Sequence, residues 1–248
     1  MKVFHKVSIK FLHVFVFVAV SFNGYGQLFK GEVLIGGNLN QVDGDRVVGY
    51  KKAGFCGGLG LVFPFRFSPK YETKSWSASM EIFFSQRGAR ETNPNYNAKD
   101  TINSASRYEF KYRLQLNYVC LPFMLHYTDK ERYSVGLGLS YNRLVSSKEI
   151  EFDIPQTYDT VAHFNSSDFM FVCDLRCRIW QQLKVGFRFE YSITPIRSRF
   201  FYASGYNKPD ETRRQYNNTL SLYLVYVFNE KKSDLEAEKY KKKNIYYY

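Results

Sequence analysis

One stretch of the chain alternates between apolar and polar residues without exception. Between Tyr108 and Tyr118, the even positions are all apolar or aromatic and the odd positions are all polar. Side chains of a β-strand point alternately to its two faces, so the pattern predicts a strand with one apolar and one polar face. About eleven residues suffice for a tilted strand to cross a membrane's hydrocarbon layer. We therefore expect the apolar row, which has tyrosines at both ends, to face lipid.

Seven further segments alternate in the same way, which makes eight predicted strands. The strand at Tyr108 continues past a change of phase at Val119–Leu121 to Tyr127, and Pro122 predicts a bulge or a strand end there. Regular strands with turn residues between them and no helical pattern are typical of all-β folds. The seven others are Val33–Asn40, Gly54–Phe63, Trp76–Gln86, Tyr133–Tyr141, Phe169–Trp180, Leu183–Tyr191 and Thr219–Phe228.

The connections between these strands differ in length. Residues 41–53, 87–107, 145–168 and 192–218 form long polar connections, whereas 128–132 and 181–182 are short and 64–75 is intermediate. Outer-membrane barrels have long loops outside the cell and short turns in the periplasm, and an even strand number places both termini on one side.

Alternation alone does not say which face is outside, because a soluble lipocalin-like barrel turns its apolar face inward. The polar face here is rich in small residues, which suit the narrow interior of an eight-stranded barrel better than a surface in water. We therefore predict an all-β fold, an eight-stranded antiparallel up-and-down transmembrane β-barrel with apolar side chains outward. The small residues are Gly36, Gly58, Gly60, Ser77, Ser79, Ser134, Gly136, Gly138 and Ser140.

The two ends of the chain differ from the barrel region. Residues 1–26 combine three lysines with an apolar run from Phe11 to Phe22 and a Gly-x-Gly sequence, which predicts a cleaved signal peptide with Gln27 as the new N-terminus. The apolar run is too short to span a bilayer. The barrel is expected to occupy residues 27–228, and the charged segment 229–248 is expected to be a solvated periplasmic tail.

Composition narrows the classes of function. Aromatic residues make up 19% of the 248 residues, and the net charge of +12 is dispersed along the chain rather than gathered in a nucleic-acid-binding patch. The four cysteines form no CxxC pair and have no histidine at zinc-site spacing. We expect no metal, no cofactor and no nucleic acid, and outer-membrane lipid as the surroundings of the barrel.

Charged residues of both signs fall on the predicted inner face of the strands. We predict a charge network in the lumen that plugs the barrel, because an unpaired buried charge would be costly. A narrow anion-preferring pore is the alternative, since the bases outnumber the acids. The residues are Glu81, Glu109, Lys111, Arg113, Asp174, Arg176, Arg178, Lys184, Arg188 and Glu190.

Catalytic chemistry has little support in the sequence. Only His126 and His163 remain after the signal peptide, and His163 lies in a long loop near Asp159 and Asp168. A hydrolase at the outer rim would need such a histidine with a carboxylate. A solvated loop histidine explains the same residues, so we assign no catalytic residue and keep a rim hydrolase as a distant alternative.

Four stretches of the chain carry a resemblance to a known family. The stretches are Gln41-Val-Asp-Gly-Asp with Gly49-Tyr-Lys-Lys-Ala-Gly54, Leu116-Asn-Tyr-Val-Cys-Leu-Pro-Phe123, Gly136-Leu-Gly-Leu-Ser-Tyr141 and Tyr191-Ser-Ile-Thr-Pro-Ile-Arg197. With these stretches, over about Val33–Phe228, the chain resembles the PorT-like outer-membrane β-barrel proteins of Gram-negative bacteria. The resemblance implies an eight-stranded barrel without catalytic residues and, by analogy with some relatives, an accessory or scaffold role in protein secretion or envelope assembly, with envelope or secretion proteins as partners.

Overall fold

A computed structural model describes residues 29–45, 47, 49–67, 74–93, 110–130, 132–151, 154–155, 163–202 and 209–229. The predicted signal peptide and almost all of the predicted tail lie outside these ranges. Within them, no helix is long and apolar enough to cross a membrane. The strands are β1 (Lys30–Asp43), β2 (Lys52–Phe67), β3 (Lys74–Asn93), β4 (Phe110–Asp129), β5 (Tyr133–Glu151), β6 (Ile154–Pro155), β7 (Ser167–Trp180), β8 (Leu183–Ser192), β9 (Arg197–Tyr202) and β10 (Pro209–Phe228).

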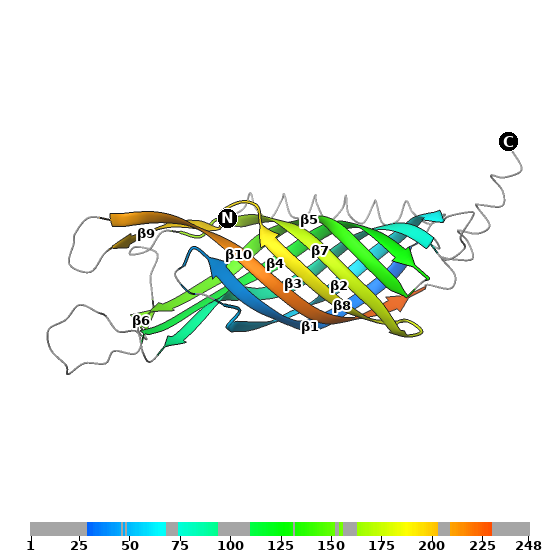
Figure 1. Cartoon of the computed structure of the whole chain (residues 1–248), viewed down its shortest axis with the longest axis horizontal. Coiled ribbons are helices and arrows are strands. Elements are labelled where there is room, and N and C mark those ends of the chain that lie inside the picture. Colours follow the sequence, from blue (N-terminus) through cyan, green and yellow to red (C-terminus); the bar gives the residue numbers. More distant parts are fainter. Residues whose placement is uncertain are drawn as a thin grey trace, which may run out of the picture.

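Eight of these strands close into a barrel. The order is β1-β2-β3-β4-β5-β7-β8-β10, every pair is antiparallel, and β10 pairs with β1 from Asp43↔Tyr216 to Gly31↔Phe228 to complete the ring (Figure 1). The predicted eight-stranded antiparallel barrel is therefore confirmed. The first residue of β1 and the last of β10 lie at the same end as the short turns after β4 and β7, which is the periplasmic end in barrels of this kind.

Large apolar side chains form an exposed belt around the outside of the ring. All eight barrel strands contribute to this belt, and a soluble monomer would not expose so continuous an apolar surface. Trp76, Tyr127, Tyr133 and Tyr226 edge the belt at the short-turn end. The predicted outward orientation of the apolar side chains thus holds at the level of the belt, which includes Ile35, Leu59, Leu61, Met80, Ile82, Phe123, Leu125, Leu137, Leu139, Phe171, Leu175, Phe187, Leu222 and Leu224.

Inward-facing glycines stand directly opposite the largest side chains of the lumen. Gly36 pairs with Tyr223, and a Cβ on Gly36 would overlap the backbone and the Cβ of that tyrosine. Gly58 faces Phe83 and Gly136 faces His126 in the same way. Because the lumen of an eight-stranded barrel just accommodates its own side chains, each large residue needs a neighbour of minimal size. This pairing explains the small residues on the polar face of the sequence pattern.

The orientation of the Tyr108 stretch differs from the prediction. In β4 the apolar row faces inward, with Tyr112, Leu114, Leu116 and Tyr118 buried, while Arg113 is exposed on the outer face. The prediction that this row faces lipid is therefore wrong. This half of β4 extends above the apolar belt, where the barrel is surrounded by water, so its polar row faces outward and its apolar row packs inside.

Pro122 produces neither a bulge nor a strand end. β4 runs through it to Asp129, and the β3–β4 ladder only lacks pairs between Met80↔Phe123 and Phe83↔Cys120, with the register unchanged. A proline has no N–H to donate, which accounts for such a gap. The register shift lies instead in β5, where Val145 is an extra residue between the partners of Tyr118 and Asn117. Because of this bulge, the inward-facing residues of β5 remain paired with the inward-facing residues of β4 on both sides of Val145.

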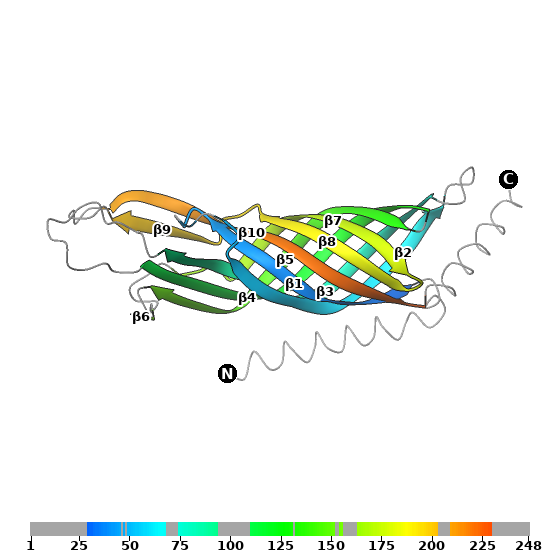
Figure 2. The ribbon, with the colours of Figure 1, turned by 60° about the horizontal axis from the view of Figure 1, so that its bottom comes forward.

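Two sheet extensions project from the end opposite the short turns (Figure 2). β3, β4 and β5 continue beyond the ring as one extension, and β9 with the first part of β10 forms the other. Residues 87–107, 145–168 and 192–218 are predicted to be long connections, but parts of all three are strand. The sequence of β9, RSRFFY, has no clear alternation of apolar and polar residues. The two-residue periodicity that indicates a strand is therefore absent, and the pairing of β9 with β10 could not be predicted from the sequence.

We predict that Gly36→Ala destabilises the barrel by about 1–3 kcal/mol, because the new methyl group would force β10 to move. Gly37→Ala is the matched control, since its Cβ would meet only the Gly54 carbonyl oxygen at 3.5 Å on the exposed outer face. Urea titrations of the refolded proteins in detergent, read by heat-modifiable gel migration, measure the difference. Equal midpoints for the two variants would show that the lumen tolerates the extra volume.

Candidate functional site: the charged lumen and the rim

A buried network of five charged residues fills the barrel near the periplasmic end; we term it the lower network. Arg176 donates to Glu32, Glu81 and Asp174 at 2.6–2.7 Å. Arg188 donates to both oxygens of Glu81 at 2.8 and 2.9 Å and reaches Asp174 at 3.3 Å. Each arginine therefore bridges two or more carboxylates, the geometry in which buried guanidinium groups are best satisfied.

Strand register brings these residues together. Asp174 on β7 is the direct partner of Arg188 on β8, and Glu81 on β3 stands opposite Gly60, whose missing side chain leaves room for the carboxylate. The hydroxyl of Tyr223 donates to Asp174, and its ring lies 5.0 Å from the guanidinium carbon of Arg188. The network thus joins strands that are far apart in the sequence and packs an aromatic ring against its cations.

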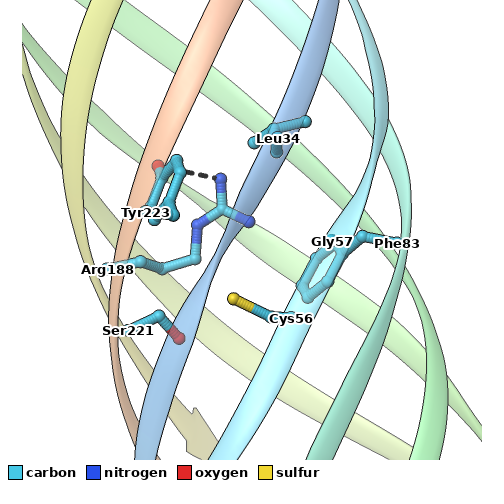
Figure 3. Close-up of a pocket in the computed structure, with 7 residues that line it drawn as sticks. All are labelled: Leu34, Cys56, Gly57, Phe83, Arg188, Ser221 and Tyr223. Carbon is cyan, nitrogen blue, oxygen red and sulfur yellow. Dashed lines mark hydrogen bonds between the residues drawn. The ribbon is translucent and has the colours of Figure 1, made fainter.

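A small cavity borders the lower network. Arg188 and Tyr223 lie on one side of it, linked by a hydrogen bond of 3.2 Å, and Cys56 and Phe83 face them from β2 and β3 (Figure 3). Leu34, Gly57 and Ser221 complete the lining. Among the described residues, no group of three or more His, Cys, Asp and Glu side chains could hold a metal ion. The cavity is too small for an organic cofactor, so it is a packing gap rather than a ligand site.

A second set of buried charges, the upper network, lies around Arg87. Its guanidinium group is 3.1 Å from Glu190 and 3.9 Å from Asp168, and it lies over the ring of Tyr118 at 5.4 Å. Asp168 also accepts hydrogen bonds from Ser192 at 3.0 Å and from Asn217 at 2.9 Å. Arg87 and Asp168 are not among the residues predicted for the lumen, although both face inward on strands whose alternation could have revealed them.

The ten residues assigned to the lumen from the sequence fall into different places. Glu81, Asp174, Arg176 and Arg188 meet in the lower network, and Glu190 belongs to the upper one. The other five do not belong to either network. Arg178 and Lys184 are half-buried at the short-turn end, Arg113 is exposed on the outer face, Lys111 lies in β4 opposite Thr92 without a described side chain, and Glu109 is outside the described residues.

In the two networks the acids outnumber the bases, the opposite of the excess of bases that the sequence predicts. Together they bury five carboxylates and three guanidinium groups. Arg113 contributes its charge outside the barrel instead of inside it. This balance does not support an anion-preferring lumen. The carboxylates are Glu32, Glu81, Asp168, Asp174 and Glu190, and the guanidinium groups are those of Arg87, Arg176 and Arg188.

A third cluster, the rim network, joins the two sheet extensions above the belt. Arg197 on β9 forms a bidentate pair with Glu149 on β5 at 2.7 and 3.0 Å and donates to Gln215 on β10 at 2.8 Å. The hydroxyl of Tyr112 donates to Glu149 at 3.0 Å, and the ring of Phe164 lies 4.0 Å from the guanidinium carbon of Arg197. Burial alone would raise the pKa of Glu149, but the hydrogen bonds and charge of Arg197 outweigh it and lower that pKa.

Asp45 lies beside the rim network in the connection after β1. One carboxylate oxygen accepts a hydrogen bond of 2.8 Å from the Val47 amide, and the side chain is buried. Burial raises the pKa of Asp45 to about 7, with Asp43 adding to the effect and Arg197 opposing it. This carboxyl group therefore titrates near neutral pH, whereas Glu149 remains charged there.

The two histidines considered for catalysis are far from a catalytic arrangement. His126 is buried in the lumen, 2.8 Å from the hydroxyl of Ser79. His163 is exposed before β7, and the Asp168 carboxylate that could have oriented it takes part in the upper network. Asp159, the other acid considered, lies outside the described residues.

A closed barrel with an apolar outer belt and a lumen of paired charges defines an integral outer-membrane β-barrel protein. In agreement, the sequence model of the outer membrane protein beta-barrel domain family matches residues 8–198, more than three quarters of the chain. The protein therefore belongs to this family and is located in the outer membrane. The narrower PorT-like resemblance is not addressed by this match.

The solved structures that match this chain include outer-membrane proteins of several bacteria. The attachment invasion locus protein Ail of Yersinia pestis is 13% identical over 80% of this chain and 98% of that one, with a TM-score of 0.38. Neisserial surface protein A is 7% identical over 80% and 96%, with a TM-score of 0.36. The COG4313 outer membrane channel of Pseudomonas putida F1 is 9% identical over 81% and 95%, with a TM-score of 0.24. No curated protein sequence matches.

We predict that Glu81→Gln destabilises the barrel by about 3–5 kcal/mol, because Arg176 and Arg188 would both lose a charged partner inside the lumen. The matched control is Lys51→Gln, which breaks a 2.6 Å ion pair with Glu91 at the exposed rim and should cost less than about 1 kcal/mol. Urea midpoints of the refolded proteins provide the comparison. Similar losses in both variants would mean that the lower network contributes little to stability.

We predict that the connection around Asp45 becomes less stable as pH rises. The folded pKa of about 7 lies above the ordinary value of 3.8, so the folded state holds a proton that the unfolded state releases. The stabilisation is complete below about pH 4 and is lost as pH rises through about 7. Hydrogen exchange of the Val47 amide, corrected for its intrinsic rate, should therefore accelerate between pH 5 and pH 8. Asp45→Asn should abolish this dependence, and an unchanged profile in that variant would contradict the assignment.

Proposed function

We propose that this outer-membrane protein is a non-enzymatic barrel that acts as an accessory or scaffold in protein secretion or envelope assembly. The observation that carries the proposal is the rim network, in which one buried Arg197–Glu149 pair holds the two sheet extensions together above a lumen filled by two further networks. A barrel of this design offers its partners a rigid outer rim rather than a passage. The N-terminal segment 1–26 would direct its export as a cleaved signal peptide.

The filled lumen favours a scaffold function over a conducting pore. Eight strands leave an interior that side chains can fill, and eight charged residues are buried in it as bridged pairs. A conducting lumen would require these pairs to separate, which is costly in a site shielded from water. The alternative of a small anion-preferring pore has the further difficulty that the buried carboxylates outnumber the buried arginines.

The rim has features that suit contact with other envelope components. β9 and the outer half of β10 pair from Gln215↔Arg197 to Pro209↔Tyr202 and extend the sheet well beyond the belt. Two stretches at this end are rich in tyrosine, asparagine and arginine, Asn93–Tyr96 and Tyr202–Tyr216, and residues 209–216 of the second belong to β10. Tyrosine and arginine are enriched at protein interfaces, and functional residues concentrate on loops held by a rigid scaffold.

We predict that crosslinking in intact cells captures a defined set of envelope or secretion proteins with the full-length barrel. A variant in which residues 200–212 are replaced by Asn-Gly shortens the β9–β10 hairpin and keeps the Arg199↔Arg213 register next to the turn. This variant leaves the Arg197–Glu149 pair in place and should fold but lose this capture. Heat-modifiable migration checks that the variant folds. His163→Ala is the matched control, and it should retain the capture.

Two results would contradict the proposal. The first is a deletion strain that secretes and assembles its envelope normally, combined with a barrel that copurifies with nothing. The second is an activity that disappears in His163→Ala, which would favour a rim hydrolase. Planar-bilayer recording tests the alternative of a small pore. A plugged barrel gives little steady conductance, whereas large reproducible ohmic steps would indicate a pore.

A further inference from the structure

Four exposed cations lie on the outer face of three adjacent strands, β3, β4 and β5, three of them on the extension and Arg143 at its base. We name the set of Arg90, Arg113, Arg143 and Lys148 the basic face. At the other described outward positions above the belt on these strands the side chains are uncharged, as at Gln86, Gln115, Asn117 and Ser146. This local excess of positive charge contrasts with the buried networks, where every arginine lies beside a carboxylate.

Three of the four cations of the basic face are neighbours. Arg90 and Arg113 are direct partners in the β3–β4 ladder. Lys148 pairs with Gln115, two residues along β4 from Arg113, so it lies diagonally beside that arginine. Like charges directly opposite one another destabilise a sheet, and diagonal neighbours are still within reach of long side chains. The arrangement therefore costs stability unless an anion lies over it.

Within the described part of the protein, no ion pair relieves this repulsion. Arg143 donates to the hydroxyl groups of Ser166 and Ser167 at 2.9 and 3.4 Å, which are neutral partners. The nearby carboxylates face inward or toward the rim, where Glu149 pairs with Arg197 and Glu91 pairs with Lys51. Burial, together with the charges of Arg113 and Arg90, lowers the pKa of Lys52 at the adjacent end of β2, which reports the positive potential of this region.

The height of the basic face above the belt identifies the layer that it meets. Arg143 is opposite Val119, the last apolar outward residue of β4, and Lys148 and Arg113 lie about four and six residues further along the strand. At about 3.4 Å per residue and a tilt of about 40°, these cations span from the belt edge to about 15 Å above it. The headgroup layer of a phospholipid leaflet is only about 5–8 Å deep.

We propose that the basic face binds a phosphorylated glycolipid of the outer leaflet, whose sugar headgroup carries phosphate groups above the hydrocarbon layer. The apolar belt directly below the basic face accommodates the acyl chains, and the cations bind the phosphates as charge-assisted hydrogen-bond donors. The amide and hydroxyl groups of Gln115, Asn117 and Ser146 lie between the cations and suit the hydroxyl groups of sugars. The bound lipid supplies the anions that the sheet itself lacks.

The test compares the full-length barrel with the triple variant Arg90→Gln/Arg113→Gln/Lys148→Gln in lipid nanodiscs. The matched control is Lys51→Gln/Lys130→Gln/Arg132→Gln, which removes the same charge from exposed positions outside the basic face. Four disc compositions are used: phosphatidylcholine alone, and phosphatidylcholine with diphosphoryl lipid A, with dephosphorylated lipid A or with phosphatidylglycerol. The midpoint of the heat-modifiable transition and the affinity for fluorescent lipid A are measured in each.

We expect the difference in midpoint between the wild type and the triple variant to change sign with the lipid. In phosphatidylcholine alone the triple variant should be at least as stable as the wild type, since it removes the like-charge contact. With diphosphoryl lipid A the wild type should gain several degrees, and the triple variant should not. Removal of three charges near an anionic surface should weaken lipid A binding about a hundred-fold at low salt, while the control retains wild-type affinity.

Several outcomes would overturn the proposal. Equal midpoints of the wild type in phosphorylated and dephosphorylated lipid A would show that phosphate is not recognised. An equal gain in phosphatidylglycerol discs would mean that any anionic surface suffices and that no glycolipid is selected. A loss of affinity in the control as large as in the triple variant would assign binding to overall charge. Low stability of the triple variant in phosphatidylcholine would assign a structural role to the cations.

Discussion

The structure depends on the pairing of charges in a lumen too narrow to hydrate them. Arg176 and Arg188 each bridge carboxylates from other strands, and these contacts tie β1, β3, β7 and β8 together across the interior. A buried charge without its partner would be far more costly than the pair is favourable, so the network specifies the register of the ring more than it adds stability. The inward glycines follow from the same constraint. Each allows a large residue on the next strand to reach the barrel axis.

A second constraint is the change of surroundings along the barrel axis. At the level of the belt the outside is lipid, so apolar side chains point outward and polar ones inward. Above the belt the outside is water, and the polarity of the two faces is reversed, as in β4, where Leu114 and Leu116 are buried and Arg113 is exposed. The crossover occurs near Tyr118–Leu121, where both faces of the strand are apolar. β4 thus continues without a break from the lipid layer into water.

This reversal separates the functional surfaces of the molecule. The lumen is occupied by side chains, and its buried arginines all lie beside carboxylates, so the proposed contacts are assigned to the outer surface above the membrane. The rim network fixes the two extensions at their base, and Asp45 adds a group that titrates near neutral pH to this region. The basic face lies on the outer side of β3, β4 and β5, so a lipid bound there and a protein bound at the β9–β10 hairpin would contact different extensions of the barrel.

The sequence by itself determined the fold class, the eight barrel strands and the outward belt, because period-two alternation and small lumen residues are local consequences of a two-faced sheet. It also placed Glu81, Asp174, Arg176, Arg188 and Glu190 on the inner face. It could not determine the direction of the Tyr108 row, since the same alternation fits a strand in lipid or one in water. Nor could it identify the partners of Arg87 or the Arg197–Glu149 pair, because register and closure of the ring bring those residues together. These features depend on the tertiary structure, which alone decides where each strand leaves the membrane.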